Sequence, residues 1–525
     1  MKRRLFVLAA GPMVLGFALA WAPQPAQPSA QAPADLDTYV SGVMKTFEVP
    51  GLALAIVKDG KVVVAKGYGV RKMGEPAAVD AQTRFGIASN TKVFTAVALG
   101  MLVEEGKIAW DAPVITYLPG FRLSDPFVTR ELTVRDLLVH RSGLGLGAGD
   151  LLWWPASTYT RKEVAQRLRY IPLATSFRSA YAYDNVLYLV AGEVIETVSG
   201  QSWEEFVGGR ILKKVGMNGS TVRHSEVASG SNVAAPHAPL DGKVAPIKPF
   251  DSDNTNPAGG INSNAEDMAK WMNVLLAKGQ LPDGSRLFSE RTYRQLTSIV
   301  TPMNVPQLPA ELAPLQPNFL GYALGLSVSD YRGRKSVSHT GGLPGYVSKV
   351  FWIPDIEFGV TILTNQESGA AFEAIGYHAA DRFLGPPMTD WPALYRRITE
   401  RQAANIAAAE KKAAASRDAA SRPSLPLARY AATYTDVWYG DIAIELQGER
   451  LAMQFTKTPS LVGDLEHFQY DTFIVRWRDR ELRADAYVTF SLNPDGTIDQ
   501  AKMRAVSPAT DFSFDFQDLL LKPKR

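Results

Sequence analysis

The chain reads FGIASNTK from Phe85 to Lys92, directly before an apolar segment that ends at Gly106. Within that segment, apolar side chains recur at helical spacing: Val93, Phe94, Val97, Met101 and Leu102. The pattern predicts a helix over residues 89–106, closed by the glycine. Ser89 and Lys92 are three positions apart, so they share one face of this helix at its first turn.

The pair of Ser89 and Lys92 suits nucleophilic catalysis. A serine hydroxyl is a weak nucleophile until a neighbouring base removes its proton. A buried lysine is such a base, because burial disfavours its ammonium form. An isolated S-x-x-K motif, however, arises often by chance in a chain of 525 residues. The structural alternative is a helix cap beside a surface lysine, so the interpretation depends on other motifs.

A second motif, Tyr183-Asp184-Asn185, precedes an apolar helical pattern that begins at residue 186. A tyrosine phenol near a lysine can carry a proton to or from a reacting group. Asn185 lies two residues further on and can hydrogen-bond the amide of a substrate. Taken alone, the triplet equally fits a core tyrosine followed by a helix cap.

A third motif, His339-Thr340-Gly341-Gly342, precedes a predicted strand. Its small residues let a substrate backbone lie beside the edge of a strand, where His339 and Thr340 can hydrogen-bond it. The backbone N–H groups of Ser89 and Gly342 are candidates for an oxyanion hole. An ordinary glycine-rich turn is the structural alternative.

Strand patterns stand at both ends of the region that holds these motifs. Apolar runs at 52–57 and 62–65 are joined by Asp59-Gly60, a strong hairpin signal, and further strands are predicted at 346–353 and 358–364. Helical stretches and loops fill the region between them. The order predicts an α+β fold, an α/β sandwich in which an antiparallel sheet of N- and C-terminal segments is flanked by helices and carries an inserted helical subdomain.

The C-terminal part has a different sequence pattern. An alanine-rich stretch at 401–420 favours a helix or spacer, and short strand-like runs separated by turns begin at Tyr430. They predict a small all-β barrel or sandwich. The expected organisation is a signal peptide at 1–20, a flexible spacer at 21–34, a catalytic domain at 35–400, an alanine-rich helix and proline linker at 401–426, and a β-barrel domain at 427–525.

The N-terminus has the layout of a secretory signal peptide. Three basic residues at 2–4 precede an uncharged, mostly apolar run at 5–20, which ends in Ala18-Leu19-Ala20. An uncleaved membrane anchor is the alternative, but the run is shorter than the roughly 20 residues of a spanning helix. Cleavage nearer Ala30 also fits. We expect a periplasmic or secreted protein without a stable membrane anchor.

Composition excludes several classes of function. A net charge of +3 gives no electrostatic case for nucleic acid. The absence of cysteine excludes disulfides and thiol nucleophiles. The six histidines show no H-E-x-x-H or other metal-ligand spacing, so we predict neither a metal nor a cofactor. No G-x-S-x-G occurs, which argues against an α/β-hydrolase.

Together, the three motifs in this order resemble the serine β-lactamase and penicillin-binding-protein superfamily. The similarity is greatest to its class C β-lactamase-related, D-alanyl-D-alanine carboxypeptidase-like branch. LLVHRSGL at 137–144 and PAGGI at 257–261, followed by AEDM at 265–268, resemble further segments of that branch. The resemblance spans roughly residues 35–390. The tail resembles, more weakly, the lipocalin-like C-terminal domain of some members.

The resemblance implies roles for individual residues. Ser89 is the acylated nucleophile, Lys92 its base or proton relay, and Asn185 positions the substrate amide. Tyr183 protonates the leaving group and then activates water, although the first proton acceptor stays open between it and Lys92. Many members carry lysine where this chain has His339. Because histidine is only partly charged near neutral pH, a weaker hold on a substrate carboxylate is expected, titrating near pH 6.5.

The sequence therefore predicts a secreted serine hydrolase that cleaves amide bonds of small or unusual peptides through an acyl-enzyme on Ser89. A carboxylesterase with the same residues, a β-lactamase, and a penicillin-binding protein without turnover are the alternatives. The expected partner is a small-molecule or peptide substrate, and a homo-oligomer is compatible with the sequence.

Overall fold

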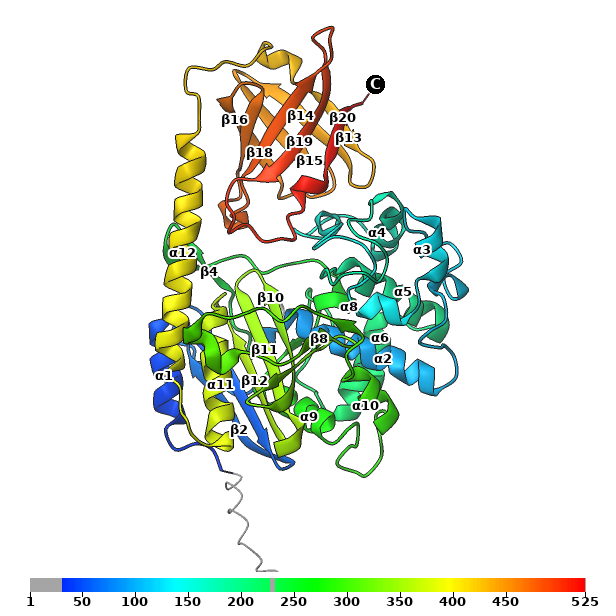
Figure 1. The fold of residues 1–525 in the computed structure, drawn as a ribbon, viewed down its shortest axis with the longest axis vertical. Helices are drawn as coiled ribbons and strands as arrows, with labels where there is room; N and C mark the ends of the chain where they lie inside the picture. The colour runs from blue at the N-terminus through cyan, green and yellow to red at the C-terminus, as the bar shows by residue number, and fades with distance from the viewer. Residues whose placement is uncertain (1–30, 227–231, 525) are drawn as a thin grey trace, which may run out of the picture.

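A computed structural model describes residues 31–226 and 232–524. The predicted signal peptide at 1–20 and most of the spacer lie outside the described residues. Figure 1 shows a large mixed body below a small barrel, with one long helix running along the side of both. In the described part of the chain, no helix is long and apolar enough to cross a membrane.

The large body is built on an eight-stranded antiparallel sheet in the order β2-β1-β12-β11-β10-β9-β8-β7. Its strands are β1 (Gly51–Lys58), β2 (Lys61–Gly69), β7 (Thr301–Pro302), β8 (Leu320–Tyr322), β9 (Ser327–Tyr331), β10 (Arg334–Leu343), β11 (Tyr346–Ile353) and β12 (Phe358–Thr364). β1 pairs with β12 from Leu52 opposite Thr364 to Lys58 opposite Phe358. The N-terminal hairpin is thus joined to the C-terminal strands, which confirms the predicted fold class.

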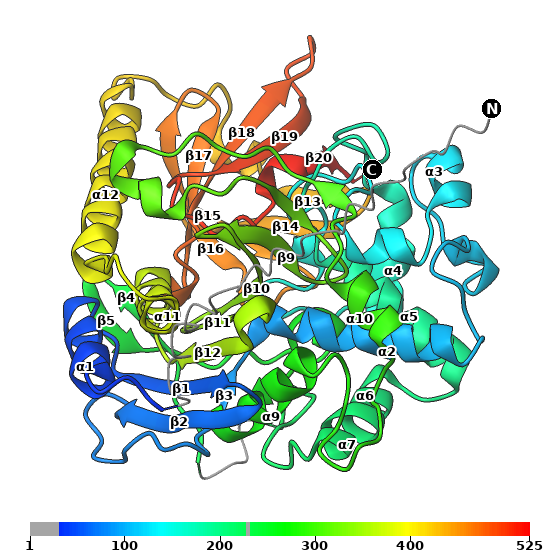
Figure 2. The same ribbon diagram turned by 60° about the horizontal axis from the view of Figure 1, so that its bottom comes forward.

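Helices cover both faces of this sheet (Figure 2). α1 (Leu36–Thr46) and α11 (Gly369–Leu384) lie on one face, and α9 (Ala265–Leu276) lies on the other. β1 is buried along its whole length for this reason. Its alternate residues enter different cores: Leu52, Leu54 and Ile56 on one side, and Ala53, Ala55 and Val57 on the other.

The inserted segment is mainly helical and packs beside the sheet. Its helices are α2 (Lys92–Glu104), α3 (Pro126–Glu131), α4 (Arg161–Arg167), α5 (Val186–Ser199), α6 (Trp203–Val207), α7 (Lys213–Val215), α8 (Asn256–Gly259) and α10 (Glu290–Leu296). α2 is buried almost all round and packs on α5. The helix predicted over 89–106 is a 3-10 turn at Ala88–Thr91 that continues into α2.

A long helix, α12 (Trp391–Ala415), connects the two bodies. It begins before the alanine-rich stretch, so the boundary expected at residue 400 falls inside one continuous helix. Asp390 caps its start by accepting a hydrogen bond from the backbone N–H of Ala393. Tyr395 and Ile398 still pack against the core, but the alanine-rich residues beyond them are mostly exposed, so helix propensity sustains that part.

The C-terminal strands close into an eight-stranded barrel, as the sequence predicted. They are β13 (Ala432–Asp436), β14 (Gly440–Gln447), β15 (Arg450–Phe455), β16 (Val462–Gln469), β17 (Thr472–Trp477), β18 (Ala486–Leu492), β19 (Ile498–Ala505) and β20 (Leu520–Pro523). β13 pairs with β20, which removes both sheet edges. Buried aromatic side chains pack against one another in its core: Tyr430, Tyr434, Phe455, Phe473, Trp477, Phe490 and Phe516.

Polar contacts fix one end of the barrel to the large body. The Arg483 guanidinium forms a two-pronged ion pair with Glu367, at 2.6 and 2.8 Å. Arg167 donates to the carbonyl oxygen of Trp438 over 2.9 Å, and the backbone N–H of Thr158 donates to that of Lys457 over 2.8 Å. The barrel is therefore docked rather than only tethered.

Candidate active site

Ser89 lies in the 3-10 turn that leads into α2. A short strand, β3 (Phe85–Gly86), brings the chain to this turn and pairs with β6 (Asn262–Ser263). The next residues turn sharply, and buried Ala88 takes a left-handed conformation with φ of 50°. Such a conformation in a non-glycine residue is costly and is typical of functional sites. It presents Ser89, which is partly exposed, at the start of the helix.

Lys92 is fully buried and its ammonium nitrogen has three neighbours. Nζ lies 2.9 Å from Ser89 Oγ, 2.7 Å from Asn185 Oδ1 and 3.0 Å from the carbonyl oxygen of Ala258. Burial lowers the pKa of Lys92 to about 7, although the nearby carboxylates act in the opposite direction. A neutral amine has two N–H groups and one lone pair. The amide and carbonyl oxygens take the two N–H groups, so the lone pair faces the Ser89 hydroxyl.

Tyr183 lies against the same pair. Its ring centroid is 4.9 Å from Lys92 Nζ. Burial raises the pKa of Tyr183 well above its usual value, and a hydrogen bond with Ser89 offsets this only in part. The phenol is therefore protonated near neutral pH, whereas the lysine titrates there. This difference favours Lys92 as the group that takes the first proton and Tyr183 as a proton donor.

Asn185 stands directly before α5 and connects Lys92 to a buried carboxylate. Its Nδ2 donates to Asp150 Oδ2 over 2.9 Å. Asp150 is completely buried and also accepts hydrogen bonds from Trp153 Nε1, at 2.9 Å, and from Ser513 Oγ, at 2.8 Å. Burial raises the pKa of Asp150 to about 7, and these donors oppose the rise.

The other residue of the second motif is structural. Asp184 is buried, accepts a hydrogen bond from Ser142 Oγ over 3.4 Å, and donates its backbone N–H to His140 Nδ1 over 3.2 Å. Burial raises the pKa of Asp184 to about 8. These contacts join the motif to the LLVHRSGL segment at 137–144. Together with the bond from Asn185 to Asp150, they fix the turn before α5.

The third motif forms the end of β10 nearest Ser89. β9 pairs with β10 only as far as Ser338, while β11 continues to Leu343, so residues 339–343 have a strand neighbour on one side only. Thr340 and Gly342 are exposed, and Gly341 is buried between them. A Cβ on Gly341 would lie 2.2 Å from the carbonyl oxygen of Ile87. Glycine is therefore what lets this strand lie against the nucleophile turn.

His339 differs from its expected state. The carbonyl oxygen of Thr340 accepts a hydrogen bond from His339 Nδ1 over 2.6 Å, so Nε2 accepts one from the Tyr322 hydroxyl over 2.8 Å. Burial and the neighbouring Lys92 lower the pKa of His339 to about 3. The expectation of a partly charged histidine that titrates near pH 6.5 is wrong, because the imidazole is neutral and almost completely buried. Direct contact between His339 and substrate stays a prediction.

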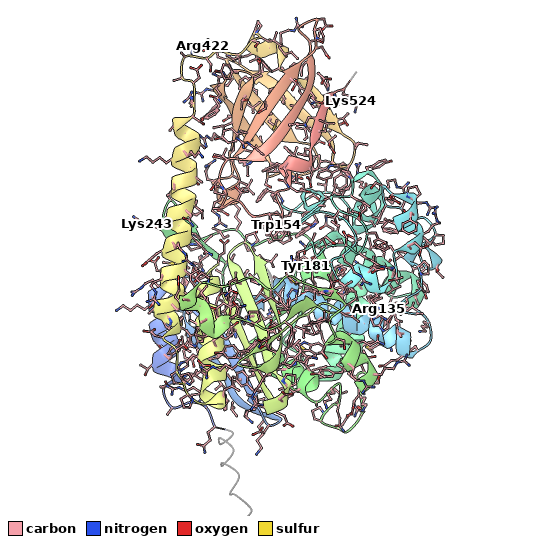
Figure 3. The ribbon with its side chains drawn as sticks, viewed as in Figure 1. Arg135, Trp154, Tyr181, Lys243, Arg422 and Lys524 are labelled. Atoms are coloured by element: carbon pink, nitrogen blue, oxygen red, sulfur yellow. The ribbon has the colours of Figure 1, made fainter. Side chains whose placement is uncertain are left out.

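The structure thus brings Ser89, Lys92, Tyr183 and Asn185 into one cluster, with β10 beside it. In Figure 3 the labelled Tyr181 marks this region, between the sheet and the inserted helices and below Trp154. Sequence reasoning missed Asp150 and Ser513. Among the described residues, no group of three or more histidine, aspartate or glutamate side chains is arranged to hold a metal ion.

Comparisons with known proteins agree with this arrangement. The family described as Beta-lactamase matches residues 36–383, and a domain family of unknown function matches residues 416–523. Unguisins hydrolase ungD of Aspergillus violaceofuscus is 27% identical over 493 residues, covering 88% of this chain and 86% of its own. Protein flp of Staphylococcus aureus is 24% identical over 341 residues, which is 63% of each chain.

Two solved structures share the fold. The octameric penicillin-binding protein homologue from Pyrococcus abyssi is 23% identical with a TM-score of 0.59, covering 93% of this chain and 99% of its own. A D-stereospecific amidohydrolase from Streptomyces sp. is 23% identical with a TM-score of 0.52, covering 65% of this chain and 98% of its own. The first of these likenesses includes the barrel. Because the family match spans well over half of the chain and includes the motifs of the catalytic cluster, the protein belongs to the Beta-lactamase family and is a serine hydrolase.

Proposed function

We propose that this hydrolase cleaves amide bonds in small or unusual peptides through an acyl-enzyme on Ser89. The observation that carries the proposal is the environment of Lys92 Nζ. Two fixed acceptors hold its N–H groups and a third contact, at 2.9 Å, is the Ser89 hydroxyl. A base with a pKa of about 7 at this distance is suited to general base catalysis near neutral pH.

Acylation follows from this geometry. Lys92 takes the Ser89 proton as Oγ bonds to the substrate carbonyl carbon, and the carbonyl oxygen becomes an oxyanion. The backbone N–H groups of Ser89 and Gly342 stabilise that charge. As the C–N bond breaks, the Tyr183 phenol donates a proton to the leaving nitrogen, and the Lys92 ammonium returns a proton to the phenolate. The amine leaves and the acyl group stays on Ser89 as an ester.

Deacylation reverses the sequence with water as the nucleophile. Water adds to the ester carbonyl carbon while its proton passes through the Tyr183 hydroxyl to the neutral amine of Lys92. The bond between that carbon and Ser89 Oγ then breaks, and the Lys92 ammonium returns its proton to Oγ. The products are a carboxylic acid and the restored serine.

Features of the site favour a peptide as the substrate. The one-sided pairing of residues 339–343 leaves strand backbone beside Ser89, along which a second peptide backbone can lie. The neutral state of His339 removes a positive charge suited to the carboxylate of a β-lactam. The shared fold of a D-stereospecific amidohydrolase supports substrates that contain D-residues.

Location and assembly are further parts of the proposal. The basic and apolar N-terminal pattern supports export to the periplasm or medium. The octameric state of the homologue from Pyrococcus abyssi supports a homo-oligomer. Cell fractionation with N-terminal sequencing tests the first, and light scattering after size-exclusion chromatography tests the second.

The decisive experiment is a screen of matched amides and esters with D- and L-residues, with wild type and Ser89→Ala in parallel. We expect amide turnover by wild type, none by Ser89→Ala, and loss of fluorophosphonate labelling in the variant. Full activity of Ser89→Ala would overturn the proposal. Turnover of esters alone would indicate a carboxylesterase, and rapid hydrolysis of nitrocefin a β-lactamase. Stoichiometric penicillin labelling without turnover would indicate a penicillin-binding protein.

A further inference from the structure

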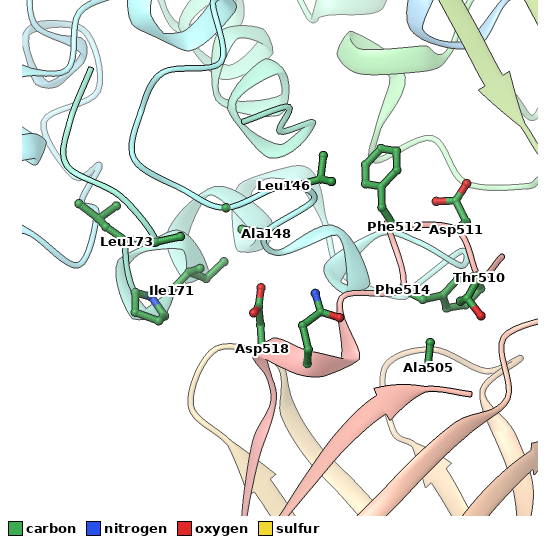
Figure 4. Close-up of a pocket in the computed structure, with 14 residues that line it drawn as sticks. Leu146, Ala148, Ile171, Leu173, Ala505, Thr510, Asp511, Phe512, Phe514 and Asp518 are labelled. Atoms are coloured by element: carbon green, nitrogen blue, oxygen red, sulfur yellow. The ribbon is translucent and has the colours of Figure 1, made fainter. Parts of the chain in front are cut away.

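The segment between β19 and β20 leaves the barrel and enters the large body. Asp515 accepts hydrogen bonds from the backbone N–H groups of Gly149, at 2.7 Å, and Leu151, at 3.1 Å. Figure 4 shows Phe512 of this segment pointing away from the barrel, beside Leu146. The Phe512 ring lies edge-on to that of Tyr183, with centroids 6.1 Å apart. The segment therefore reaches the catalytic cluster itself.

Ser513 makes the most direct of these contacts. Its hydroxyl donates to Asp150 Oδ2 over 2.8 Å, and both residues are buried. The same carboxylate oxygen accepts the Asn185 amide N–H, while Oδ1 accepts Trp153 Nε1. Three donors from three parts of the chain therefore fix the Asp150 carboxylate in place. One of them, Ser513, belongs to the barrel domain.

The fixed carboxylate determines which way the Asn185 amide points. Trp153, Asn185 and Ser513 all donate to the Asp150 oxygens, so this carboxyl group acts as an acceptor and holds the NH₂ side of the amide. The oxygen side must then face Lys92 Nζ, 2.7 Å away. A rotated amide would set its NH₂ group against the N–H groups of Lys92. Lys92 would then lose one hydrogen-bond acceptor, and its lone pair would no longer be held toward the Ser89 hydroxyl.

We propose that the barrel completes the catalytic centre, with Ser513 and Asp150 acting as positioning residues that orient Lys92 through Asn185. The proposal rests on the proposed function, because it takes Ser89 and Lys92 as the reacting pair. It assigns the barrel a part in the chemical step that is separate from covering the site or binding the substrate. Neither Ser513 nor Asp150 touches the reacting atoms.

A positioning role has a specific kinetic signature. Removing the hydrogen bond from Ser513 to Asp150 lowers the fraction of enzyme in which Lys92 can accept the Ser89 proton. The space for substrate is unchanged. A hydrogen bond to a charged group contributes about 1.5–3 kcal/mol, which corresponds to roughly a 10- to 100-fold change in rate. We expect Ser513→Ala to lower the maximal rate at which Ser89 is covalently modified about tenfold and to leave the half-saturating concentration unchanged.

The test uses saturation kinetics of Ser89 labelling by a fluorophosphonate probe, on the full-length protein, so that no substrate needs to be known. The variants are Ser513→Ala, Asp150→Asn and the double variant. Ser507→Ala is the matched control, because Ser507 lies in the same segment but bonds the exposed Glu410. If Ser513 acts through Asp150, Ser513→Ala lowers the labelling rate much less in the Asp150→Asn background than in the wild-type background.

Several results would decide against the inference. It is overturned if Ser513→Ala labels within twofold of wild type, if only the half-saturating concentration changes, or if the two substitutions act independently. Should Ser513→Ala not fold by circular dichroism, Ser513→Cys keeps nearly the same shape with a weaker donor and must show the same slower labelling. Wild-type protein that is not labelled at all contradicts the proposed function instead, so the two failures are distinct.

Discussion

The hydroxyl of Tyr322 donates a hydrogen bond to Nε2 of His339 over 2.8 Å, and the other ring nitrogen is engaged by the carbonyl oxygen of Thr340. Both imidazole nitrogens are therefore satisfied within the protein. With a pKa lowered to about 3, the ring stays neutral at every pH where the enzyme is expected to work.

This neutrality predicts a flat pH dependence of binding. For a peptide with a free C-terminal carboxylate, the ratio of its KM to the KM of its C-terminal amide should not change between about pH 5 and pH 8, because neither His339 nor the substrate carboxylate titrates there. Steady-state kinetics with this peptide and with its C-terminal amide as control measure the effect. A KM that climbs through about pH 6.5 for the acid alone would show that His339 is charged and holds the carboxylate.

Lys92 predicts a pH dependence of the chemical step. Only the neutral amine accepts the Ser89 proton, so the labelling rate should rise with pH and level off above about pH 7, where Lys92 loses its proton. Lys92→Arg should lower the rate by at least about a thousandfold, since arginine does not deprotonate. Lys270→Arg, on the exposed side of α9, is the control. A rate independent of pH from 5.5 to 8.5 would speak against Lys92 as the base.

Alanine substitutions at Gly341 and Gly342 form a matched pair for measuring stability. Gly341→Ala places a Cβ 2.2 Å from a carbonyl oxygen, whereas a Cβ on Gly342 meets nothing within 4 Å. We expect Gly341→Ala to destabilise the protein by about 1–3 kcal/mol, because β10 must move away from the nucleophile turn. Gly342→Ala should unfold at the wild-type temperature. Thermal unfolding followed by circular dichroism measures both, and equal melting temperatures would contradict the close packing.

Asp136 predicts an acid-dependent loss of stability. It is buried and accepts hydrogen bonds from Thr133 Oγ1, at 2.7 Å, and from Arg141 and Arg178, and these partners hold its pKa below the usual value. Because the folded-state pKa is lowered, this stabilisation is present above about pH 4 and is lost as the pH falls through the lowered pKa. Asp136→Asn should cost about 3–5 kcal/mol at pH 7.

At acid pH, Asp136→Asn should lower the free energy of unfolding by less than it does at pH 7. Denaturant unfolding of Asp136→Asn and wild type at pH 7 and at pH 3 gives the two differences. Asp283→Asn is the control, because the pKa of Asp283 is also lowered although this residue lies at an exposed turn. A loss of equal size at both pH values would mean that packing, rather than the ionised carboxylate, stabilises this loop.

Local pattern was enough to predict the reacting pair and the sheet. Ser89 and Lys92 are neighbours on one helical turn, so their contact follows from spacing. The hairpin at 52–65 and the strands at 346–364 each have a strong signal, and an antiparallel sheet is the simplest way to bury both. Tyr183 and Asn185 were found because they stand directly before a clear helix.

The rest depends on contacts that spacing does not encode. Ser513 and Asp150 meet although they are 363 positions apart, and neither stands in a pattern that predicts chemistry. The state of His339 depends on burial beside Tyr322, a residue of another strand. Asp150 ends the glycine-rich stretch GLGLGAGD, residues 143–150, but that position does not show that its carboxylate is buried. No signal pointed to Ser513.

The pairing of β1 with β12 has a consequence for the order of folding during synthesis. β1 lies between β2 and β12, so the hairpin made from the first part of the chain has to wait until Thr364 has been synthesised before its second edge is covered. The contact between Ser513 and Asp150 forms later still, since Ser513 lies 363 positions after Asp150. A growing chain therefore carries Ser89 and Lys92 long before the arrangement around them is finished. The newly made protein becomes a fully assembled hydrolase only after Ser513 has been synthesised.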